Sequence, residues 1–485
     1  MVTVGVMLSL FMAAVESTVV ATAMPTIVSE LGGLALYSWV FTAYMLTSTT
    51  TVPIYGKLSD IFGRRPVFMV AMALFLTGSV LCGQSQNMGQ LIAFRALQGL
   101  GAGGLMPLAF IIIGDIFSFE QRARMQGLFS GVWGVASIIG PLLGGFLVDT
   151  VSWHWVFYVN LLPGAVATLL LWFGLRDPVR APGAARPPID FGGAILLSAS
   201  AVALMLGLSE LRSPAGMTLL GLAAALFAAL LWVERRAADP MLPLPLFKDR
   251  LFAVATAQGL LAGWAMFGST SFVPLFVQGV LGTSATAAGS ALTPMMLGWV
   301  GASIIGSRLL LRFGYRTIAL AGMTTLVSGV FLMTRVSPNA TLPGVMFNLA
   351  LMGIGMGLSI PAFMIAVQSS VQRKVLGTAT ATVQFSRSIG GTLGVSVMGV
   401  ILSTQLAANL RAAGAEAIGI SLNSLLRPAG DVSAPAVSEV LRGALTGALQ
   451  SVFLAALIAA VAGLVVTALA PRGSVIQRAA AREVA

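Results

Sequence analysis

Residues 4–28 read VGVMLSLFMAAVESTVVATAMPTIV, an apolar stretch whose one charged residue, Glu16, lies near its middle. About 20 apolar residues at about 1.5 Å each match the hydrocarbon core of a bilayer, so this stretch is predicted to be a membrane-spanning helix. A carboxylate is costly at that depth, and ionisable groups inside a membrane commonly serve transport. Glu16 is therefore a candidate proton-coupling residue, with a neutral, hydrogen-bonded structural acid as the alternative.

The composition of the whole chain predicts an all-α protein with many membrane spans. Of the 485 residues, 57% are hydrophobic and 9% are charged, and the mean hydropathy is +0.94. Soluble domains carry about 25% charged residues. Hydropathy predicts fourteen spans, near residues 4–28, 36–55, 67–83, 90–115, 124–148, 155–175, 191–209, 214–234, 251–280, 286–311, 317–335, 342–368, 376–403 and 444–470.

Two charged, Pro-rich connectors divide the spans into six, two and six. The first, RDPVRAPGAARPPID, covers residues 176–190, and the second covers residues 234–250. The outer segment 403–443 is the longest predicted loop and could form a short amphipathic helix. The predicted parts are an N-terminal six-helix bundle (1–175), cytoplasmic linkers with two extra transmembrane helices (176–250), a C-terminal six-helix bundle (251–470) and a cytoplasmic tail (471–485).

The basic residues are distributed as expected for membrane topology rather than for nucleic-acid binding. The net charge is +11, and alternating loops place twenty basic residues on one side and five on the other, while Arg95 and Arg387 lie within spans. Loops rich in Lys and Arg stay in the cytoplasm, so both termini are predicted to be cytoplasmic. The single cysteine, Cys82, excludes an intrachain disulfide and a cysteine metal cluster.

The loop between spans two and three carries a recognisable pattern. It reads GKLSDIFGRR over residues 56–65, and a similar stretch, GSRLLLRFGYR, covers residues 306–316 without the aspartate. The first resembles the loop signature of the major facilitator superfamily, and the partial second copy suggests an internal duplication, as in facilitator halves. A basic cytoplasmic turn arising by chance is the alternative. The residues expected to form a cytoplasmic gating loop are Gly56, Asp60, Gly63, Arg64, Arg65, Asp115 and Arg122.

Span four contains a charged residue followed by a glycine-rich face, FRALQGLGAGG over residues 94–104. An arginine inside a membrane must find an acid, carbonyl groups or water. The resemblance implies a role in proton coupling for Arg95. The alternative is a structural arginine whose side chain reaches the outer interface.

Span five contains GLFSGVWGVASIIGPLLGG over residues 127–145. Small residues four apart let another helix approach closely, which by itself is also compatible with simple tight packing. The arrangement resembles the antiporter motif of proton-coupled exporters, so the resemblance implies export rather than import. The residues that carry this motif are Gly131, Gly134, Gly140, Pro141 and Gly144.

Three further stretches resemble the fourteen-span drug:proton antiporter branch of this superfamily, of the multidrug efflux type. They are ESTVVATAMPTI (16–27), WHWVFYVNLLPG (153–164) and FSRSIGGTLGVSVMG (385–399). Members of that branch usually have an aspartate where this chain has Glu16. The resemblance covers essentially the whole chain.

Helix rise ranks the charged residues by depth. Glu16 and Arg387 lie about 18 and 17 Å above the inner ends of their spans, and Arg95 lies about 10 Å higher. This ranking predicts that Glu16 and Arg95 are linked through water rather than in direct contact. With Glu16 ionised, the interior carries a charge near +1, which favours lipophilic monocations, zwitterions or neutral compounds over dications. The candidate residues of the substrate cavity are Glu16, Arg387, Gln384 and Asn348.

These observations predict a proton-coupled antiporter that exports amphipathic drugs or other lipophilic small molecules by alternating access. The alternative is the same fold exporting one physiological metabolite, lipid or siderophore. No GxxxxGK[ST] motif is present, so a proton gradient is expected to supply energy without a cofactor. With one histidine and one cysteine, an enzyme is disfavoured. The expected setting is a monomer in the bilayer of a bacterial cytoplasmic (inner) membrane, with protons and small molecules, but no nucleic acid, as partners.

Overall fold

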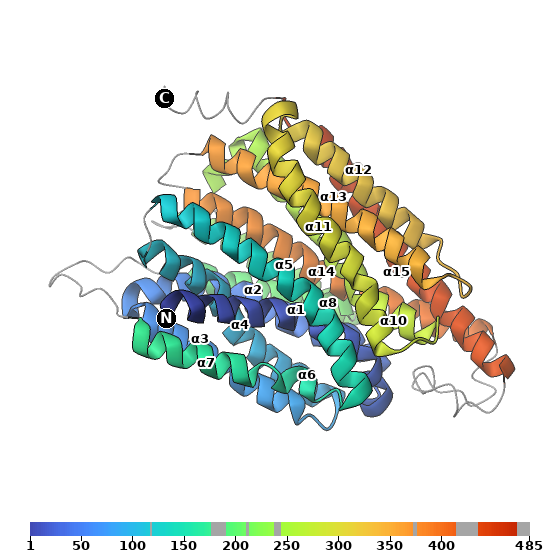
Figure 1. The fold of residues 1–485 in the computed structure, drawn as a ribbon. Coiled ribbons are helices and arrows are strands. Elements are labelled where there is room, and N and C mark those ends of the chain that lie inside the picture. Colours follow the sequence, from blue (N-terminus) through green and yellow to red (C-terminus); the bar gives the residue numbers. More distant parts are fainter. Residues whose placement is uncertain are drawn as a thin grey trace. The chain divides into compact units, whose positions relative to one another are not determined.

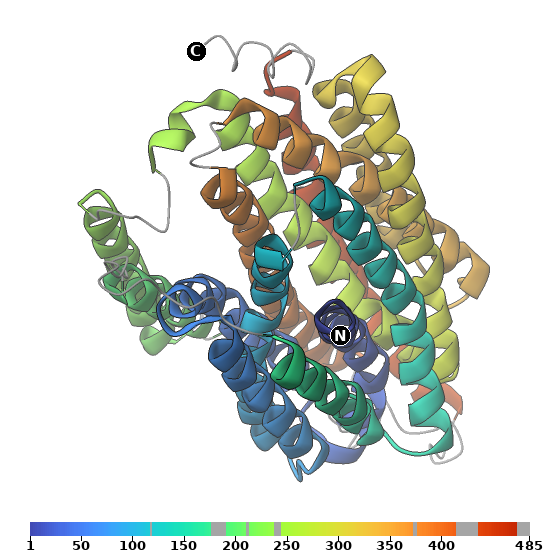
Figure 2. The same cartoon turned by 60° about the vertical axis from the view of Figure 1, so that its left-hand side comes forward.

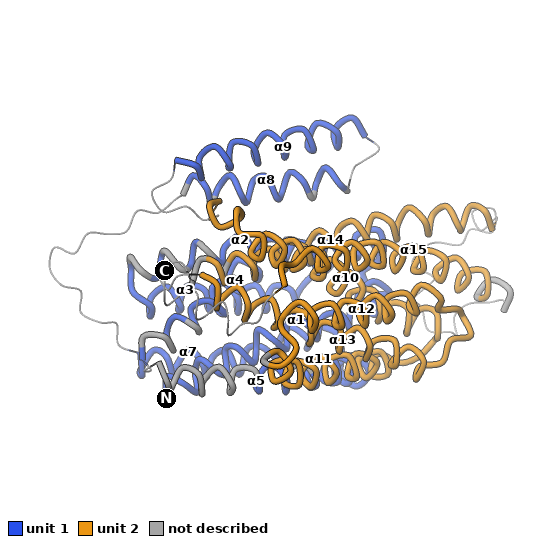
Figure 3. The backbone as a smooth tube through the Cα atoms, turned by 90° about the horizontal axis from the view of Figure 1, so that it is seen from above, with its two compact units in different colours: residues 1–241 blue, residues 242–485 orange. Residues whose placement is uncertain are grey.

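The computed structural model describes residues 1–116, 119–175, 191–209, 213–236, 244–371, 376–413 and 435–472. Within these ranges the chain is almost entirely helical and no residue is in a β-strand, as the sequence predicted. The helices form two compact units, Met1–Met241 and Leu242–Ala485 (Figure 3).

The first unit contains long helices together with two short elements, the 3-10 helix η1 and the helix α6 (Figure 1). Its elements are α1 (Val2–Leu31), η1 (Leu34–Leu36), α2 (Tyr37–Phe62), α3 (Arg64–Gly83), α4 (Met88–Ile116), α5 (Phe119–Thr150), α6 (Trp155–Tyr158), α7 (Leu161–Gly174), α8 (Phe191–Ser209) and α9 (Pro214–Glu234).

The second unit begins with a short 3-10 helix and continues with six long helices. Its elements are η2 (Leu244–Lys248), α10 (Arg250–Gly279), α11 (Ala285–Phe313), α12 (Tyr315–Thr334), α13 (Leu342–Ser370), α14 (Leu376–Ala412) and α15 (Pro435–Ala468).

Twelve helical segments among the described residues are long and apolar enough to cross a membrane. The predicted spans beyond these twelve correspond to α2 and α8. Helix α2 has 26 residues but carries the hydroxyl-rich stretch LTSTTT (46–51), and α8 has 19 residues. An all-α protein with many membrane spans is therefore confirmed, while the count of fourteen stays a prediction.

The two units share one scheme of helix packing, which supports the internal duplication suggested by the two loop sequences. In the first unit α4 packs between α2 and α3, and α1 packs against α5 and α7. In the second unit α13 packs between α11 and α12, and α10 packs against α14 and α15. The central helix of each trio uses glycines for this contact: a Cβ at Gly103 would collide with Ser48 of α2, and one at Gly357 with Trp299 of α11.

The loop motifs of the two halves adopt similar turns. Gly63 (φ 93°) directly follows α2, and Gly314 (φ 74°) directly follows α11, with the next helix starting at the following residue in each case. Positive φ with extended ψ is a conformation that essentially only glycine adopts without strain. Gly56, which was expected to help form the turn, instead lies inside α2, because this helix continues seven residues beyond the predicted span.

Helices α8 and α9 form an antiparallel hairpin that contacts the rest of the first unit through α8 and α2 (Figure 2). Large apolar side chains are exposed along α9, including Met217, Phe227 and Trp232, as expected for a helix that faces lipid. This pair corresponds to the two predicted linking spans. The connector 176–190 lies outside the described residues, and the predicted domain boundaries stay a prediction.

The sixth span agrees with the prediction as one apolar segment, Trp155–Gly174, which contains a turn at Val159 and Asn160 between α6 and α7. One predicted segment differs from the structure. The predicted outer segment 403–443 is partly a continuation of its neighbours, since α14 extends to Ala412 and α15 starts at Pro435. Helices commonly extend past the hydrocarbon core, where hydropathy no longer detects them.

Gly314→Ala is expected to destabilise the protein by about 1–3 kcal/mol, because a Cβ strains this backbone conformation. Gly221→Ala is the control: it lies in the regular helix α9, where a Cβ would meet no atom within 4 Å, and should be neutral or slightly stabilising. Thermal unfolding of the purified variants in detergent measures both effects. Equal unfolding midpoints for the two variants would contradict the proposed strain.

Candidate functional site

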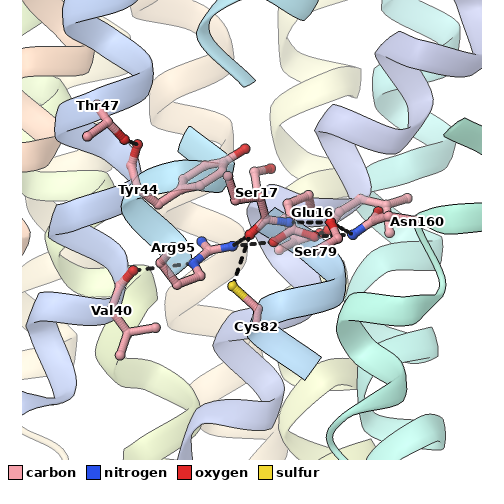
Figure 4. A network of polar contacts seen from close by, with 12 residues as sticks. Glu16, Ser17, Val40, Tyr44, Thr47, Ser79, Cys82, Arg95 and Asn160 are labelled. Carbon is pink, nitrogen blue, oxygen red and sulfur yellow. Dashed lines mark hydrogen bonds and ion pairs between the residues drawn. The ribbon is translucent and has the colours of Figure 1, made fainter. Parts of the chain in front are cut away.

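The candidate site is built around Glu16, which lies near the midpoint of α1, about 21 Å from the start of the helix. Its side chain is completely buried. Both carboxylate oxygens have partners: Oε1 contacts Nη1 of Arg95 in an ion pair, and Oε2 accepts a hydrogen bond of 2.5 Å from Nδ2 of Asn160 (Figure 4). The acid is therefore held from two directions by charge-assisted hydrogen bonds.

The guanidinium of Arg95 is enclosed as completely as the acid. Only 2% of the residue is exposed. Besides Glu16, Nη1 donates to Oε1 of Gln98 at 2.7 Å, and Nε donates to the carbonyl oxygen of Val40 at 3.4 Å. The ring of Tyr44 lies 4.0 Å below the guanidinium carbon, a cation–π distance. These contacts fix both the position and the orientation of the charge.

A second layer of polar side chains supports this pair. Gln98 donates through Nε2 to Oγ of Ser79 at 2.8 Å, and Asn160 also lies 3.5 Å from that hydroxyl. The thiol of Cys82 lies 3.8 Å from Oε1 of Gln98. All of these side chains are buried, so each donor needs an acceptor inside the protein. The network joins α1, α2, α3 and α4 to the break between α6 and α7.

The prediction that Glu16 and Arg95 are linked only through water was wrong. That prediction ranked residues by helix rise, which assumes upright helices that start at common levels. Helices in membranes are tilted by about 20° and end at different heights. The long arginine side chain then bridges the remaining distance to the acid. One consequence is that the charges of Glu16 and Arg95 compensate each other locally.

Sequence reasoning missed several members of this network. Gln98 follows Arg95 by three residues, the spacing that places two side chains on one helix face. Asn160 was a polar residue in the first third of an apolar span, and the structure places it in the turn between α6 and α7. These two signals were available from the sequence. No comparable signal marked Ser79 or Tyr44.

The antiporter-type motif of α5 packs directly on the helix that carries Glu16. A Cβ at Gly140 would overlap Oγ1 of Thr18, and one at Gly144 would overlap Oγ1 of Thr22. Pro141, between them, is buried. The other two motif glycines lie earlier in α5: a Cβ at Gly131 would meet no atom within 4 Å, and Gly134 is only half-buried. Close approach is therefore confined to the second half of the motif, where the contacted residues of α1 lie about half a turn and nearly two turns from Glu16.

The structure describes only part of the expected gating loop. Nη1 of Arg64 donates to Oγ of Ser59 at 3.0 Å, and the guanidinium of Arg65 lies 4.3 Å from the ring of Trp172. The surroundings of Gly56 and the side chains of Asp60, Asp115 and Arg122 lie outside what the structure describes, so their predicted pairing is untested.

The cavity candidates of the second unit separate into two places. Gln384 and Arg387 line one small pocket between α10, α13 and α14. Asn348 lies nearer the first residue of α13 and its Nδ2 is 3.8 Å from Sδ of Met333 on α12. Asn348 therefore does not line the pocket that contains Arg387.

Comparison with known proteins agrees with this architecture. A sequence model of the Major Facilitator Superfamily matches residues 6–395. The chain belongs to the Major Facilitator Superfamily. Membership in this family makes it a transporter of small molecules in a membrane, not an enzyme.

The superfamily members most informative for function are two proteins of Bacillus subtilis (strain 168). The chain is 39% identical to the multidrug transporter protein MdtP over 83% of its own length and 75% of that protein. It is 40% identical to multidrug resistance protein 3 over 82% of its own length and 79% of that protein. The resemblance to the multidrug efflux type is thereby confirmed.

A solved structure supports the fold. The bacterial homologue of the human lysosomal transporter Spinster, in an inward-facing and occupied conformation, matches with a TM-score of 0.72 and 17% identity. The match covers 97% of this chain and 96% of that structure.

The Glu16–Arg95 pair is expected to show strong energetic coupling. Arg95→Met should lower stability by about 3–5 kcal/mol, because it leaves a buried acid without its counter-ion. Adding Glu16→Gln should recover most of that loss, because the amide carries no charge. Thermal unfolding of the two single variants and the double variant measures the coupling. Simple additivity of the two effects would contradict the ion pair.

Gly140→Val should abolish coupled efflux and raise passive proton flux, because the branched side chain collides with Thr18 and forces α5 away from α1. Gly131→Val is the matched control on the same helix, since it adds the same side chain where a Cβ has space. Proton flux into vesicles without substrate, at equal protein levels, measures the leak. An unchanged leak with full efflux in Gly140→Val would mean that this contact is dispensable.

Proposed function

We propose that the protein is a proton-coupled antiporter that exports amphipathic drugs or other lipophilic small molecules by alternating access. The single observation that carries the proposal is a fully buried acid at mid-helix, in direct contact with a buried arginine. Burying such a pair in a membrane costs free energy, and its presence is explained if protonation of the acid drives transport. Two relatives at about 40% identity are named as multidrug proteins, which supports the substrate class.

Proton exchange at Glu16 would act through its partners. The ionised acid accepts hydrogen bonds from Arg95 and Asn160. The protonated acid loses its attraction for the guanidinium and gains a donor of its own, so the same contacts become weaker. Protonation therefore shifts the balance between two arrangements of α1 and α4, which is the differential interaction that any coupled switch requires.

Two other features connect this pair to larger movements. Gly140 and Gly144 pack tightly against α1, so a shift of α1 would also displace α5. The gating loop between α2 and α3, with Arg64 and Arg65, is proposed to hold the cytoplasmic ends of helices together. A proton gradient drives the cycle without a bound cofactor. The protein is proposed to act as a monomer in the bacterial cytoplasmic membrane with both termini in the cytoplasm.

Glu16→Gln should abolish uphill export while leaving folding and membrane insertion intact, because the amide keeps the shape of the acid but cannot titrate. Glu16→Asp should retain part of the activity. Glu30→Gln is the control: it removes an acid from the outer end of the same helix, where Glu30 binds the indole of Trp153. Uphill export of lipophilic fluorescent compounds by proteoliposomes under an imposed proton gradient is the measurement. Full gradient-driven export by Glu16→Gln would exclude the coupling role.

A further inference from the structure

The second unit contains a pocket that the proton-coupling proposal does not use. It lies between α10, α13 and α14 and is lined by two amides, a guanidinium and an apolar wall. The polar lining residues are Gln258, Gln384 and Arg387, and the apolar wall includes Phe363 and Met364. The space amounts to about 10 Å³, room for about one water molecule.

Helix packing holds Arg387 at this pocket. Its backbone approaches α10 closely at Gly263, where a Cβ would overlap the carbonyl oxygen of Arg387, and more loosely at Gly259, where a Cβ would lie 3.9 Å from the backbone nitrogen of Arg387. The neighbouring Ser386 donates to the carbonyl oxygen of Thr256 at 2.7 Å, which also ties α14 to α10. Arg387 lies eleven residues from the start of α14, a rise of about 17 Å along the helix axis.

The guanidinium of Arg387 has no protein partner among the described residues. Its Nε is buried without a hydrogen bond, whereas Arg95 in the first unit has an acid, an amide, a carbonyl group and an aromatic ring around it. Buried polar groups are normally satisfied by protein, water or a ligand. An arginine without a partner inside a membrane-spanning helix costs free energy, so its presence needs an explanation.

The sequence of the second unit cannot supply a counter-ion at this depth. Between Asp249 and Glu416 the chain contains no aspartate or glutamate. Asp249 caps the first turn of α10 by accepting from the backbone of Leu251 and Phe252, and Glu439 is exposed near the start of α15. In the first unit the carboxylate of Glu16 is engaged on both oxygens. The positive charge of the membrane interior is therefore concentrated on Arg387.

We infer that the Arg387 pocket binds the anionic group of the substrate, so that the transporter prefers amphipathic compounds carrying a carboxylate or sulfonate. A guanidinium presents paired N–H donors that match such a group, and the amides of Gln258 and Gln384 add hydrogen-bonding capacity. The pocket admits one oxygen of the head group in place of a water molecule, and the apolar body of the substrate stays outside it. This inference rests on the proposed export of lipophilic compounds, and it replaces the monocations, zwitterions and neutral compounds expected from the sequence with anions and zwitterions.

The test compares three ligands that share one fluorophore and differ in charge: dansylglycine (an anion), dansylglycinamide (neutral) and dansylcadaverine (a monocation). Binding to the full-length protein in lipid nanodiscs is followed by dansyl fluorescence, with empty nanodiscs as the background. The wild type should bind dansylglycine about tenfold or more tightly than dansylglycinamide, and dansylcadaverine more weakly still.

Arg387→Gln should reduce the preference for dansylglycine over dansylglycinamide to about twofold or less. Arg387→Lys should keep part of the preference, because the positive charge remains but the planar guanidinium with its paired N–H donors is lost. The matched control is Arg335→Gln, which removes one positive charge from the exposed end of α12 in the same unit and should keep the full preference. Thermal unfolding checks that the variants are folded, and the wild-type order of affinities tests the sign of the charge without any variant.

Equal affinities of the wild type for the three ligands, binding of none of them, or an undiminished preference in Arg387→Gln would each overturn the inference. Because binding is measured without a proton gradient, these outcomes are distinct from failure of the proposed function. Failure of the proton-coupling proposal would appear as gradient-driven export by Glu16→Gln, with the charge preference in binding unaffected.

Discussion

The ion pair between Glu16 and Arg95 is the interaction around which the first unit is organised. A charge in a medium of low dielectric constant is stable only when its partner and its remaining hydrogen bonds are all in place. This requirement explains why α1, α2, α3, α4 and the α6–α7 break converge on one point in the membrane. Asn160, in the turn between α6 and α7, donates to the second oxygen of the acid.

Close approach of helices is the second constraint, and glycine provides it in both units. In the absence of a hydrophobic driving force between helices in lipid, association depends on packing and hydrogen bonds, so small residues are favoured at the contacts. Gly140 and Gly144 bring α5 against α1, and Gly390 and Gly394 bring α14 against α10 in the same way. The repeated use of one packing scheme is what an ancient duplication would leave behind.

The two units differ in charge despite this common scheme. The first unit pairs a buried acid with a buried base, whereas the interior of the second unit has Arg387 and no acid. A duplicated framework therefore carries two different electrostatic environments. This asymmetry separates a residue suited to exchanging a proton from one suited to attracting an anionic group.

Composition and periodicity alone predicted an all-α membrane protein and singled out Glu16 and Arg95 as charged residues within apolar spans, and the loop sequence predicted the glycine turn at Gly63. These features depend on local chemistry: apolar length must match a bilayer, and a charge within that length stands out. Contact between Glu16 and Arg95, the role of Asn160 and the separation of Asn348 from Arg387 were decided by the tertiary structure. Helix rise gives the height of a backbone atom along its own axis. Tilt, rotation and breaks determine which side chains meet, and these depend on the packing of all the neighbouring helices at once.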